Sequence, residues 1–192
     1  MPTLCGLRRR GYPAASLRLF SDRIGISKQN SLIDFSILEN CVREILDETA
    51  ERRMAVIKPI KLVITNLEDN HLEMLPMSNH PKREEFGKRE VPFSNELWID
   101  ADDFMAVPTP GYHRLTQDAE VRLRGVGIIK CNEIIMDGDA VKELRCTLDL
   151  ESRSGMEGSK RKVKGTIHWV CGKHAVPAEF RLFDRLFTVE NP

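Results

Sequence analysis

Hydrophobic positions near the start of the chain recur at helical spacing. Leu17, Phe20 and Ile24 share one face of a helix that ends near Gly25. A second set recurs at steps of three and four residues: Leu38, Cys41, Val42, Ile45 and Leu46. The pattern predicts two or three helices, of which the last ends near Glu51. Ser36 with Glu39 forms a candidate capping box for that helix, and Asp34 is a competing N-cap.

After Met54 the hydrophobic pattern becomes that of strands. Short runs that alternate apolar with polar residues, separated by turn residues, occupy 56–57, 62–64, 96–99, 121–124, 128–129, 144–150 and 166–170. Asp137-Gly138-Asp139 lies between two runs and predicts a hairpin turn. The chain is therefore expected to be mainly β with an α-helical N-terminal piece, the strands forming a small antiparallel β-barrel or sandwich.

Two segments lack strand character and are expected to be functional loops. They run from Pro76 to Pro92 and from Glu151 to Lys164, and both are polar and rich in Lys and Arg. Trp98 and Trp169 fall in predicted strands, where packing in the core is the expected role.

Composition narrows the class of protein. The 192 residues include 41% hydrophobic and 30% charged side chains, a balance that excludes a wholly disordered chain. Lys plus Arg number 29 and Asp plus Glu number 29, so a uniformly basic nucleic-acid binder is excluded and any such function needs a local patch.

No apolar run approaches the roughly 20 residues that span a bilayer, so no membrane partner is expected. The charged start MPTLCGLRRR argues against secretion, and five cysteines at irregular spacing favour a reducing, cytoplasmic location.

Motifs for catalysis or for metal and phosphate binding are missing. No G-x-S-x-G elbow or P-loop occurs, and His168 lies inside a predicted strand, where a structural role is expected. His168, Cys171 and His174 are closely spaced but lack the paired C-x-x-C element of a structural zinc site. We expect no catalytic residue, metal or cofactor in this chain, and a small metal-dependent enzyme is a disfavoured alternative.

Basic clusters make single-stranded nucleic acid the favoured ligand. One cluster is Lys160, Arg161, Lys162 and Lys164, with Arg153 shortly before it. The others are Lys82, Arg83, Lys88 and Arg89, and Arg8, Arg9 and Arg10. Lys and Arg neutralise phosphates, and Arg also bonds base edges. Solvated loops balanced by acids such as Glu84 and Glu157 are the alternative. Because aromatics are only 6% of the chain, hydrogen-bond reading of a few splayed bases is favoured over extended stacking.

Four long strings carry a resemblance. They are MPTLCGLRRRGYPAASLRLF, SNHPKREEFGKREVPFSNELWIDADDF, KRKVKGTIHWV and FRLFDRLFTVENP, in this order along the chain. Together they resemble the glutaminyl-tRNA synthetase family, in the part that follows its catalytic domain, over residues 1–192. The resemblance implies that residues 1–53 form a helical connector along the inner face of the L-shaped tRNA. It implies that residues 54–192 form the anticodon-binding β-barrel domain.

The resemblance also implies the activity of the parent enzyme. That enzyme is a class I aminoacyl-tRNA synthetase, a ligase of protein biosynthesis that uses ATP and Mg to attach glutamine to its tRNA through an aminoacyl-adenylate. The family's HIGH and KMSKS-like signatures are absent here. We therefore expect a fragment that is inactive alone, whose partners are the tRNA for glutamine and the catalytic domain of the same polypeptide. The match ends at Pro192, which suggests an incomplete second barrel with an unpaired strand edge and a tendency to associate.

Matched positions suggest the RNA contacts. Arg89, Arg161, Lys162 and Lys164 fall on family segments that approach the anticodon loop, and Lys82 accompanies Arg89. Arg153 is a further candidate ligand whose stretch matches the family poorly. Arg8, Arg9 and Arg10 are expected against the tRNA backbone, although one of them alternatively pairs with the catalytic domain. His80 and Pro81 are expected to hold the neighbouring base-reading side chains in place.

Two alternatives to this interpretation stay open. One is the corresponding domain of an archaeal or eukaryotic type of glutamyl-tRNA synthetase, which shares the barrel architecture. The other is a free-standing barrel module that binds RNA or protein.

Overall fold

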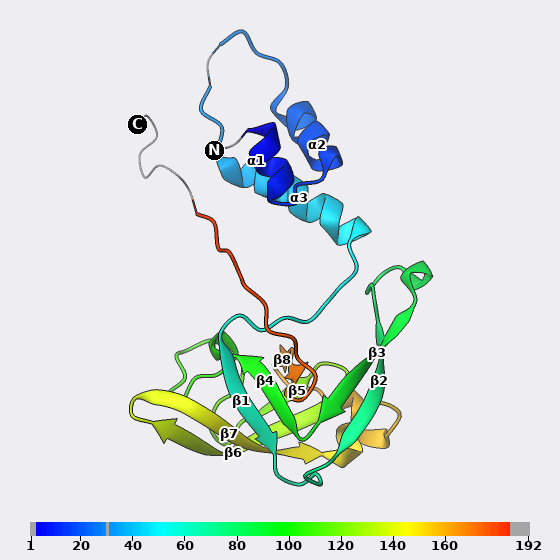
Figure 1. Ribbon diagram of the computed structural model, residues 1–192, viewed down its shortest axis with the longest axis vertical. Helices are drawn as coiled ribbons and strands as arrows, with labels where there is room; N and C mark the ends of the chain where they lie inside the picture. The colour runs from blue at the N-terminus through cyan, green and yellow to red at the C-terminus, as the bar shows by residue number, and fades with distance from the viewer. Residues whose placement is uncertain (1–2, 30, 185–192) are drawn as a thin grey trace. The chain divides into compact units, whose positions relative to one another are not determined.

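The computed structural model describes residues 3–29 and 31–184 of the chain (Figure 1). The string that matches the family at 187–192 therefore lies outside the described residues. The chain forms two compact units. Of the described residues, 3–29, 31–51 and 181–184 belong to the helical unit, and 52–180 belong to the β unit.

Three helices make up the helical unit. They are α1 (Leu4–Arg9), α2 (Ala14–Ile24) and α3 (Phe35–Thr49). Asp34 is the N-cap of α3, where its Oδ1 accepts a hydrogen bond from Ser36 N at 2.7 Å. The capping box that starts at Ser36 is therefore wrong, because Ser36 already lies inside the helix. Gly25 follows α2 with φ at 67°, a value that glycine adopts without strain.

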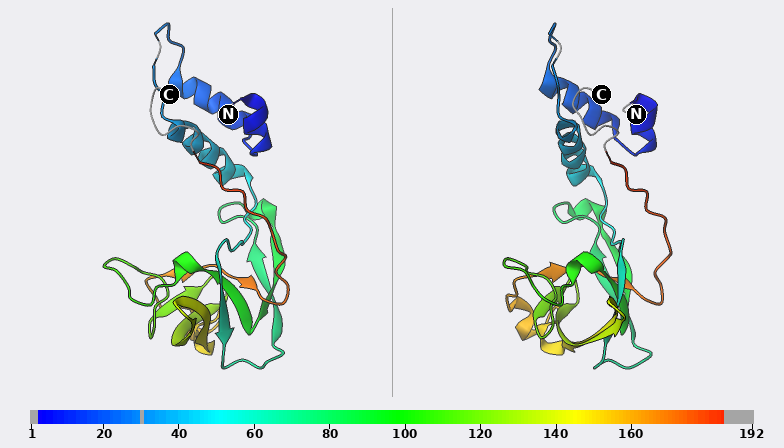
Figure 2. Two further views of the ribbon diagram at one scale, coloured as in Figure 1. Left: turned by 60° about the vertical axis from the view of Figure 1, so that its left-hand side comes forward. Right: turned by 90° about the vertical axis from the view of Figure 1, so that its left-hand side faces the viewer.

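The β unit contains one seven-stranded sheet and a separate hairpin. The strands of the sheet are β1 (Pro59–Ile64), β4 (Glu96–Asp100), β5 (Glu120–Leu123), β6 (Gly127–Asp137), β7 (Ala140–Asp149), β8 (Thr166–Ile167) and β9 (Val170–Cys171). Their order is β8-β5-β6-β7-β1-β4-β9, and the sheet curls into part of a barrel (Figure 2). The hairpin pairs β2 (Leu72–Ser78) with β3 (Lys88–Ser94). Short 3-10 turns lie at 84–86, 101–103, 150–152 and 157–160.

The mainly β fold with an N-terminal helical piece is confirmed, with details that the pattern does not carry. The turn predicted at Asp137–Asp139 joins β6 and β7, with Gly138 at φ 62°. Most strand pairs are antiparallel, but β1 with β7 and β5 with β8 are parallel. These partners are far apart along the chain, so no tight turn forces them to run in opposite directions.

Three local predictions are corrected. The segment Pro76–Pro92 is not a loop, because its two ends belong to β2 and β3 and only the residues between them form the connection. Residues 56–57 are not a strand, since β1 begins at Pro59. The run 166–170 is broken into β8 and β9, which pair with different strands of the sheet.

Two aromatic rings anchor the core of the β unit. Phe93 and Trp169 are fully buried and meet edge to face, with ring centroids 5.3 Å apart. The indole Nε1 of Trp169 donates to Arg124 O at 3.0 Å, so its polar atom is satisfied. Trp98, in contrast, is only partly buried and lines a groove, which corrects its expected place in the core.

Replacing Phe93 with Ala is expected to lower the free energy of unfolding by about 3–5 kcal/mol, because it leaves a cavity beside Trp169. Urea denaturation followed by tryptophan fluorescence measures the change. The control is Met74→Ala on the same hairpin, where the side chain is 51% exposed and a change of less than about 0.5 kcal/mol is expected. Equal losses in both variants would contradict the assignment of Phe93 to the core.

Candidate nucleic-acid interface

A buried asparagine joins two arginines at one end of the β2–β3 hairpin. Asn79 Oδ1 accepts hydrogen bonds from Arg53 Nη1 at 3.2 Å and from Arg89 Nη1 at 3.1 Å. Asn79 Nδ2 donates to Phe86 O at 2.9 Å, and the backbone O of Asn79 accepts from Arg52 N at 2.6 Å. Asn79 therefore holds three parts of the chain together. They are the hairpin connection, the two arginines and the segment that leads into the β unit. We call Arg53, Asn79 and Arg89 the arginine cluster.

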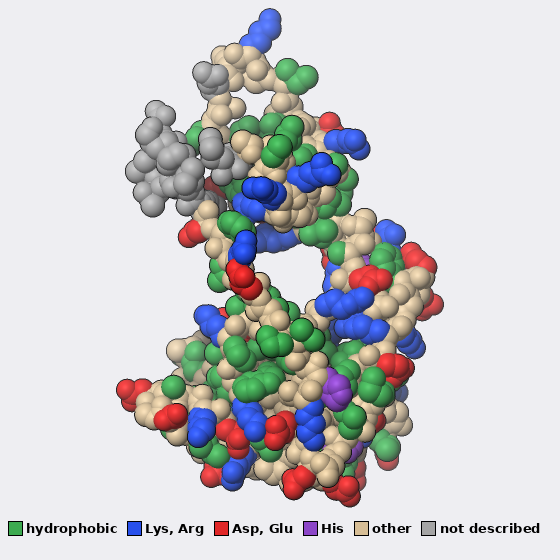
Figure 3. Space-filling model, viewed as in Figure 1, with side chains coloured by type: hydrophobic (Ala, Val, Ile, Leu, Met, Phe, Trp, Pro, Cys, Tyr) green, Lys and Arg blue, Asp and Glu red, His purple; other side chains and the backbone are tan. Residues whose placement is uncertain are grey.

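A groove of about 690 Å³ begins at this cluster. Arg53 and Arg89 lie among its lining residues, and most of the others are apolar: Met54, Val56, Ile57, Val91, Pro92, Trp98, Val170, Val176, Pro177 and Phe180. Figure 3 shows hydrophobic side chains gathered on the face of the β unit turned to the viewer, and Lys and Arg on the hairpin beside them. An apolar groove with a few cationic donors suits a flat ring that also carries polar edges.

The chain that borders the groove is held by an aspartate and a histidine. Asp100 Oδ2 accepts from Ile57 N at 2.9 Å, and His168 Nε2 lies 2.6 Å from Ala55 O. Burial favours a higher pKa for Asp100, but hydrogen bonds from the backbone N–H groups of Ile57, Asp102 and Lys58 hold its pKa below the ordinary 3.8. His168 lies between β8 and β9 and not inside a strand, and its contact with Ala55 O is structural.

The basic loop 151–164 is built around Arg161. Its guanidinium donates to Glu120 Oε2 at 2.6 Å and to Asp149 Oδ2 at 2.7 Å, and these bonds raise its pKa. Lys162 and Lys164 are exposed, and among the described residues neither has an ion pair. Arg161 therefore holds the loop against β5 and β7, while the two lysines are presented to solvent.

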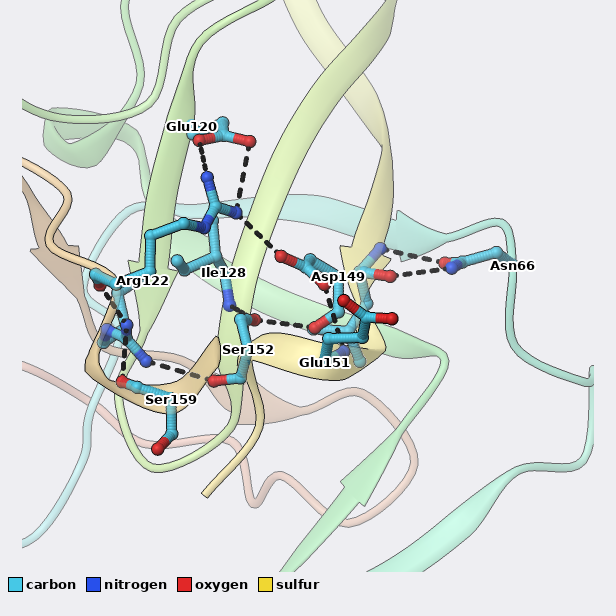
Figure 4. A network of polar contacts seen from close by, with 10 residues as sticks. Asn66, Glu120, Arg122, Ile128, Asp149, Glu151, Ser152 and Ser159 are labelled. Atoms are coloured by element: carbon cyan, nitrogen blue, oxygen red, sulfur yellow. Dashed lines mark hydrogen bonds and ion pairs between the residues drawn. The ribbon is translucent and has the colours of Figure 1, made fainter. Parts of the chain in front are cut away.

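A second arginine pins the backbone of the same loop (Figure 4). Arg122, from β5, donates to the carbonyl oxygens of Ser152, Ser159 and Arg161, at 3.3, 3.1 and 2.7 Å. Ser152 is buried, and its Oγ accepts from Ile128 N at 2.7 Å and donates to Asp149 O at 2.6 Å. Polar groups that no strand pairs are thus satisfied by side chains.

Gly165 closes this loop where it enters β8. A Cβ at that position would lie 1.9 Å from His113 O, so only glycine allows the two backbones to approach this closely. The loop is therefore tied at both ends, by Ser152 at its start and by Gly165 at its end.

The remaining predicted site residues lie elsewhere on the chain. Arg153 Nη2 forms an ion pair with Glu73 Oε2 at 2.5 Å. Lys82 is exposed, and its backbone N donates to the Nδ1 of buried His80. The ring of His80 stacks on Phe86. Arg8, Arg9 and Arg10 are exposed at the end of α1, and the guanidinium of Arg10 lies over the ring of Tyr12.

The predicted cations of the β unit therefore form two groups. Arg89 pairs in register with Met77 near the cluster end of the hairpin, whereas Glu73, the partner of Arg153, lies near the other end of β2. Lys82 belongs with the cluster end, and Arg153 belongs with the loop of Arg161, Lys162 and Lys164. Sequence reasoning missed Arg53 and Asn79, because Arg53 belongs to a run of only two arginines and Asn79 carries no charge.

A metal or nucleophile site finds little support in the described part of the chain. Residues 3–29 and 31–184 contain no group of three or more His, Cys, Asp or Glu side chains placed to hold a metal ion. Cys171 Sγ lies 3.5 Å from His174 Nδ1 and 3.3 Å from Ser94 Oγ, with no further ligand for zinc. Within the same ranges, no helix is long and apolar enough to cross a membrane.

Comparison with known proteins supplies a family. Residues 50–149 match the anticodon-binding domain of class I tRNA synthetases for E and Q, and residues 166–192 match a second such domain. The chain is 63% identical over 193 aligned residues to a glutamine–tRNA ligase of Xanthomonas euvesicatoria and 59% identical to one of Xylella fastidiosa. Each alignment covers 100% of this chain but only 33% of the relative, so the chain spans about a third of the length of these relatives.

Replacing Asn79 with Ala is expected to cost about 1–3 kcal/mol of unfolding free energy, because Phe86 O loses its donor and two guanidinium groups lose a shared acceptor. Chemical denaturation of the full chain measures this change. Asn132→Ala is the matched control, since Asn132 is exposed and accepts a single bond from Thr147 Oγ1. A loss at Asn79 no larger than that at Asn132 would mean that the cluster does not order the hairpin.

Proposed function

The chain belongs to the anticodon-binding domain family of the class I tRNA synthetases for glutamate and glutamine, and we propose that it is the tRNA-binding part of a glutamine–tRNA ligase. The observation that carries this proposal is the family match over residues 50–149, which include both the hairpin and the acids that hold Arg161. The names of the relatives favour glutamine over glutamate as the amino acid. Since the helical residues precede that match, the division at 53/54 into connector and barrel domain remains part of the proposal.

We propose that the groove beside the arginine cluster receives an unstacked base of the anticodon. Anticodon bases are accessible on their Watson–Crick edges once they leave the stack. The apolar lining accepts the base ring, and the Arg53 and Arg89 guanidinium groups offer donors at one end of the groove. A hydrogen bond from a charged donor is worth about 1.5–3 kcal/mol, so a base that lacks the matching acceptor should bind less tightly.

The basic loop 151–164 supplies phosphate contacts in this proposal. Lys162 and Lys164 are exposed side chains on a backbone that Arg122 and Gly165 hold in place. A lysine ammonium acts on phosphate as a point charge and needs no fixed fork geometry. Arg161 contributes by holding the loop, since Glu120 and Asp149 offset its positive charge. Arg153 is likewise paired with Glu73. Lys82 extends the charge at the cluster end of the hairpin.

The helices and the parent enzyme complete the proposal. Arg8, Arg9 and Arg10 form an exposed positive cluster that suits the tRNA backbone on the inner face of the L. The whole enzyme would join glutamine to its tRNA at the expense of ATP in the cytoplasm, with its active site in the catalytic domain of the same polypeptide. Magnesium finds no fitting donor set among the described residues of this chain, so no step is assigned to it here.

Replacing both Lys162 and Lys164 with Ala is expected to weaken binding to the anticodon stem-loop of the tRNA for glutamine several-fold. The slope of log affinity against log salt concentration should become less steep by about 1.4, the value for two phosphates of a single-stranded loop. Fluorescence anisotropy over a salt series measures both quantities. Lys142→Ala, an exposed lysine on β7, is the control and should change neither. An unchanged slope in the double variant would mean that the basic loop 151–164 is only a solvated surface. The same measurement with the anticodon stem-loop of the tRNA for glutamate tests the choice of tRNA.

The chain alone, mixed with ATP, glutamine and cognate tRNA, is expected to form no charged tRNA, because its sequence lacks both class I signatures. Acid-gel separation of charged from uncharged tRNA measures the product, with a full-length glutamine–tRNA ligase as the positive control. The same preparation should still shift the tRNA in a native gel at moderate salt. Charging above background would contradict the location of the active site, and a chain that leaves the tRNA unshifted would favour a protein-binding module.

A further inference from the structure

Two cysteines face each other across the longest strand pair of the sheet. Cys131 on β6 stands opposite Cys146 on β7 in the register of the antiparallel ladder. Both side chains are fully buried in the core of the β unit, and both cysteines are free thiols. This pair plays no part in the proposed RNA interface.

The backbone hydrogen bonds show which kind of pair this is. Cys131 N donates to Ala119 O at 3.4 Å, and Cys131 O accepts from Asp118 N at 2.8 Å, so both of its backbone groups point away from β7. Cys146 O likewise points away from β6, since it accepts from Thr65 N at 2.9 Å. The two residues therefore form a non-hydrogen-bonded pair, the type with Cα atoms only about 4.5 Å apart. That separation falls inside the range of about 4.4–6.8 Å found for disulfides.

The two thiols also differ in acidity. A hydrogen bond from Cys146 lowers the pKa of the Cys131 thiol, whereas the same bond and burial raise the pKa of Cys146. A register shift directly follows Cys131, where Asn132 has no partner on β7 before Glu133 pairs with Arg145. Ladder hydrogen bonds are interrupted at such a bulge, and local opening there would admit a molecule as small as water or peroxide to the two buried thiols.

The other cysteines lack this arrangement. Cys5 is exposed on α1, and Cys41 accepts a hydrogen bond from Arg23 Nη1. Cys171 contacts His174 and Ser94. Each of these three contacts no second thiol among the described residues, so each is an internal control for oxidation that depends on pairing.

We propose that Cys131 and Cys146 are a reversible oxidation site, which a peroxide converts into a cross-strand disulfide between β6 and β7. The Cys131 thiolate attacks one peroxide oxygen, the O–O bond breaks, and hydroxide leaves with Cys131 as a sulfenic acid. Cys146 sulfur then attacks the Cys131 sulfur, the S–O bond breaks, and the leaving oxygen takes up protons as water. Two thiols and one hydrogen peroxide become one disulfide and two waters, and a dithiol reductant reverses the change.

Peptide mapping of the full native chain tests the proposal. After treatment with hydrogen peroxide, denaturation and alkylation under non-reducing conditions, Cys131 and Cys146 should be lost to alkylation together. Mass spectrometry should find the Cys131 and Cys146 peptides joined, lighter by two hydrogen atoms than their sum, and dithiothreitol should separate them. Cys146→Ala should abolish the joined species and leave Cys131 as a sulfenic acid that dimedone traps.

Two results would overturn the proposal. One is full alkylation of Cys131 and Cys146 after peroxide, at a dose that oxidises exposed Cys5. The other is a crosslink that forms only when peroxide is added in denaturant, because the native register would then not be its cause. The mapping uses the unmodified chain, so it is decisive even if the Cys146 variant folds poorly, and it does not depend on whether the chain binds tRNA.

Discussion

Backbone polar groups that leave the sheet must find hydrogen-bond partners, and this requirement shapes the β unit. Asn66 pairs with both the N–H and the C=O of Leu148, and Ser152 takes up Ile128 N. Arg122 satisfies three carbonyl groups of the loop that follows β7. An unpaired buried group would cost about 1–3 kcal/mol, so each of these side chains determines the path of a segment that has no regular structure. These bonds hold the loop that presents the lysines against the sheet.

Arginine and lysine have different roles in this loop for the same reason. The arginines of the loop point inward, where the planar guanidinium can serve two acids at once, as Arg161 does with Glu120 and Asp149. The lysines point outward and carry charge without a fixed geometry. Arg53 and Arg89, at the cluster end of the hairpin, are both oriented and available to a ligand. One acceptor on Asn79 orients them, and both line the groove. A preorganised donor loses less freedom when a ligand binds.

The sequence predicts the class of fold well and the site only in part. Alternating residues locate β1, β4, β5 and β7, because burial on one face of a sheet enforces that period. The hairpin around Pro76 and Pro92 escapes the pattern, since prolines and charges at its outer positions resemble a loop. Charge identifies Arg89 and Lys162 as candidates but does not say which cations have acidic neighbours. Asn79 and Arg53 could not be found, because their importance comes from tertiary contacts between residues 26 positions apart.

Gly165 and Ser152 have a consequence for how such a domain can change over evolutionary time. Because Ser152 and Gly165 hold the two ends of the basic loop 151–164, a change in an exposed side chain between them acts on the loop and not on the sheet. The loop is thus an adjustable segment on a rigid frame. Exposed side chains there, such as Lys162 and Lys164, are therefore positions where the surface charge can change without a change in the strands that carry the loop.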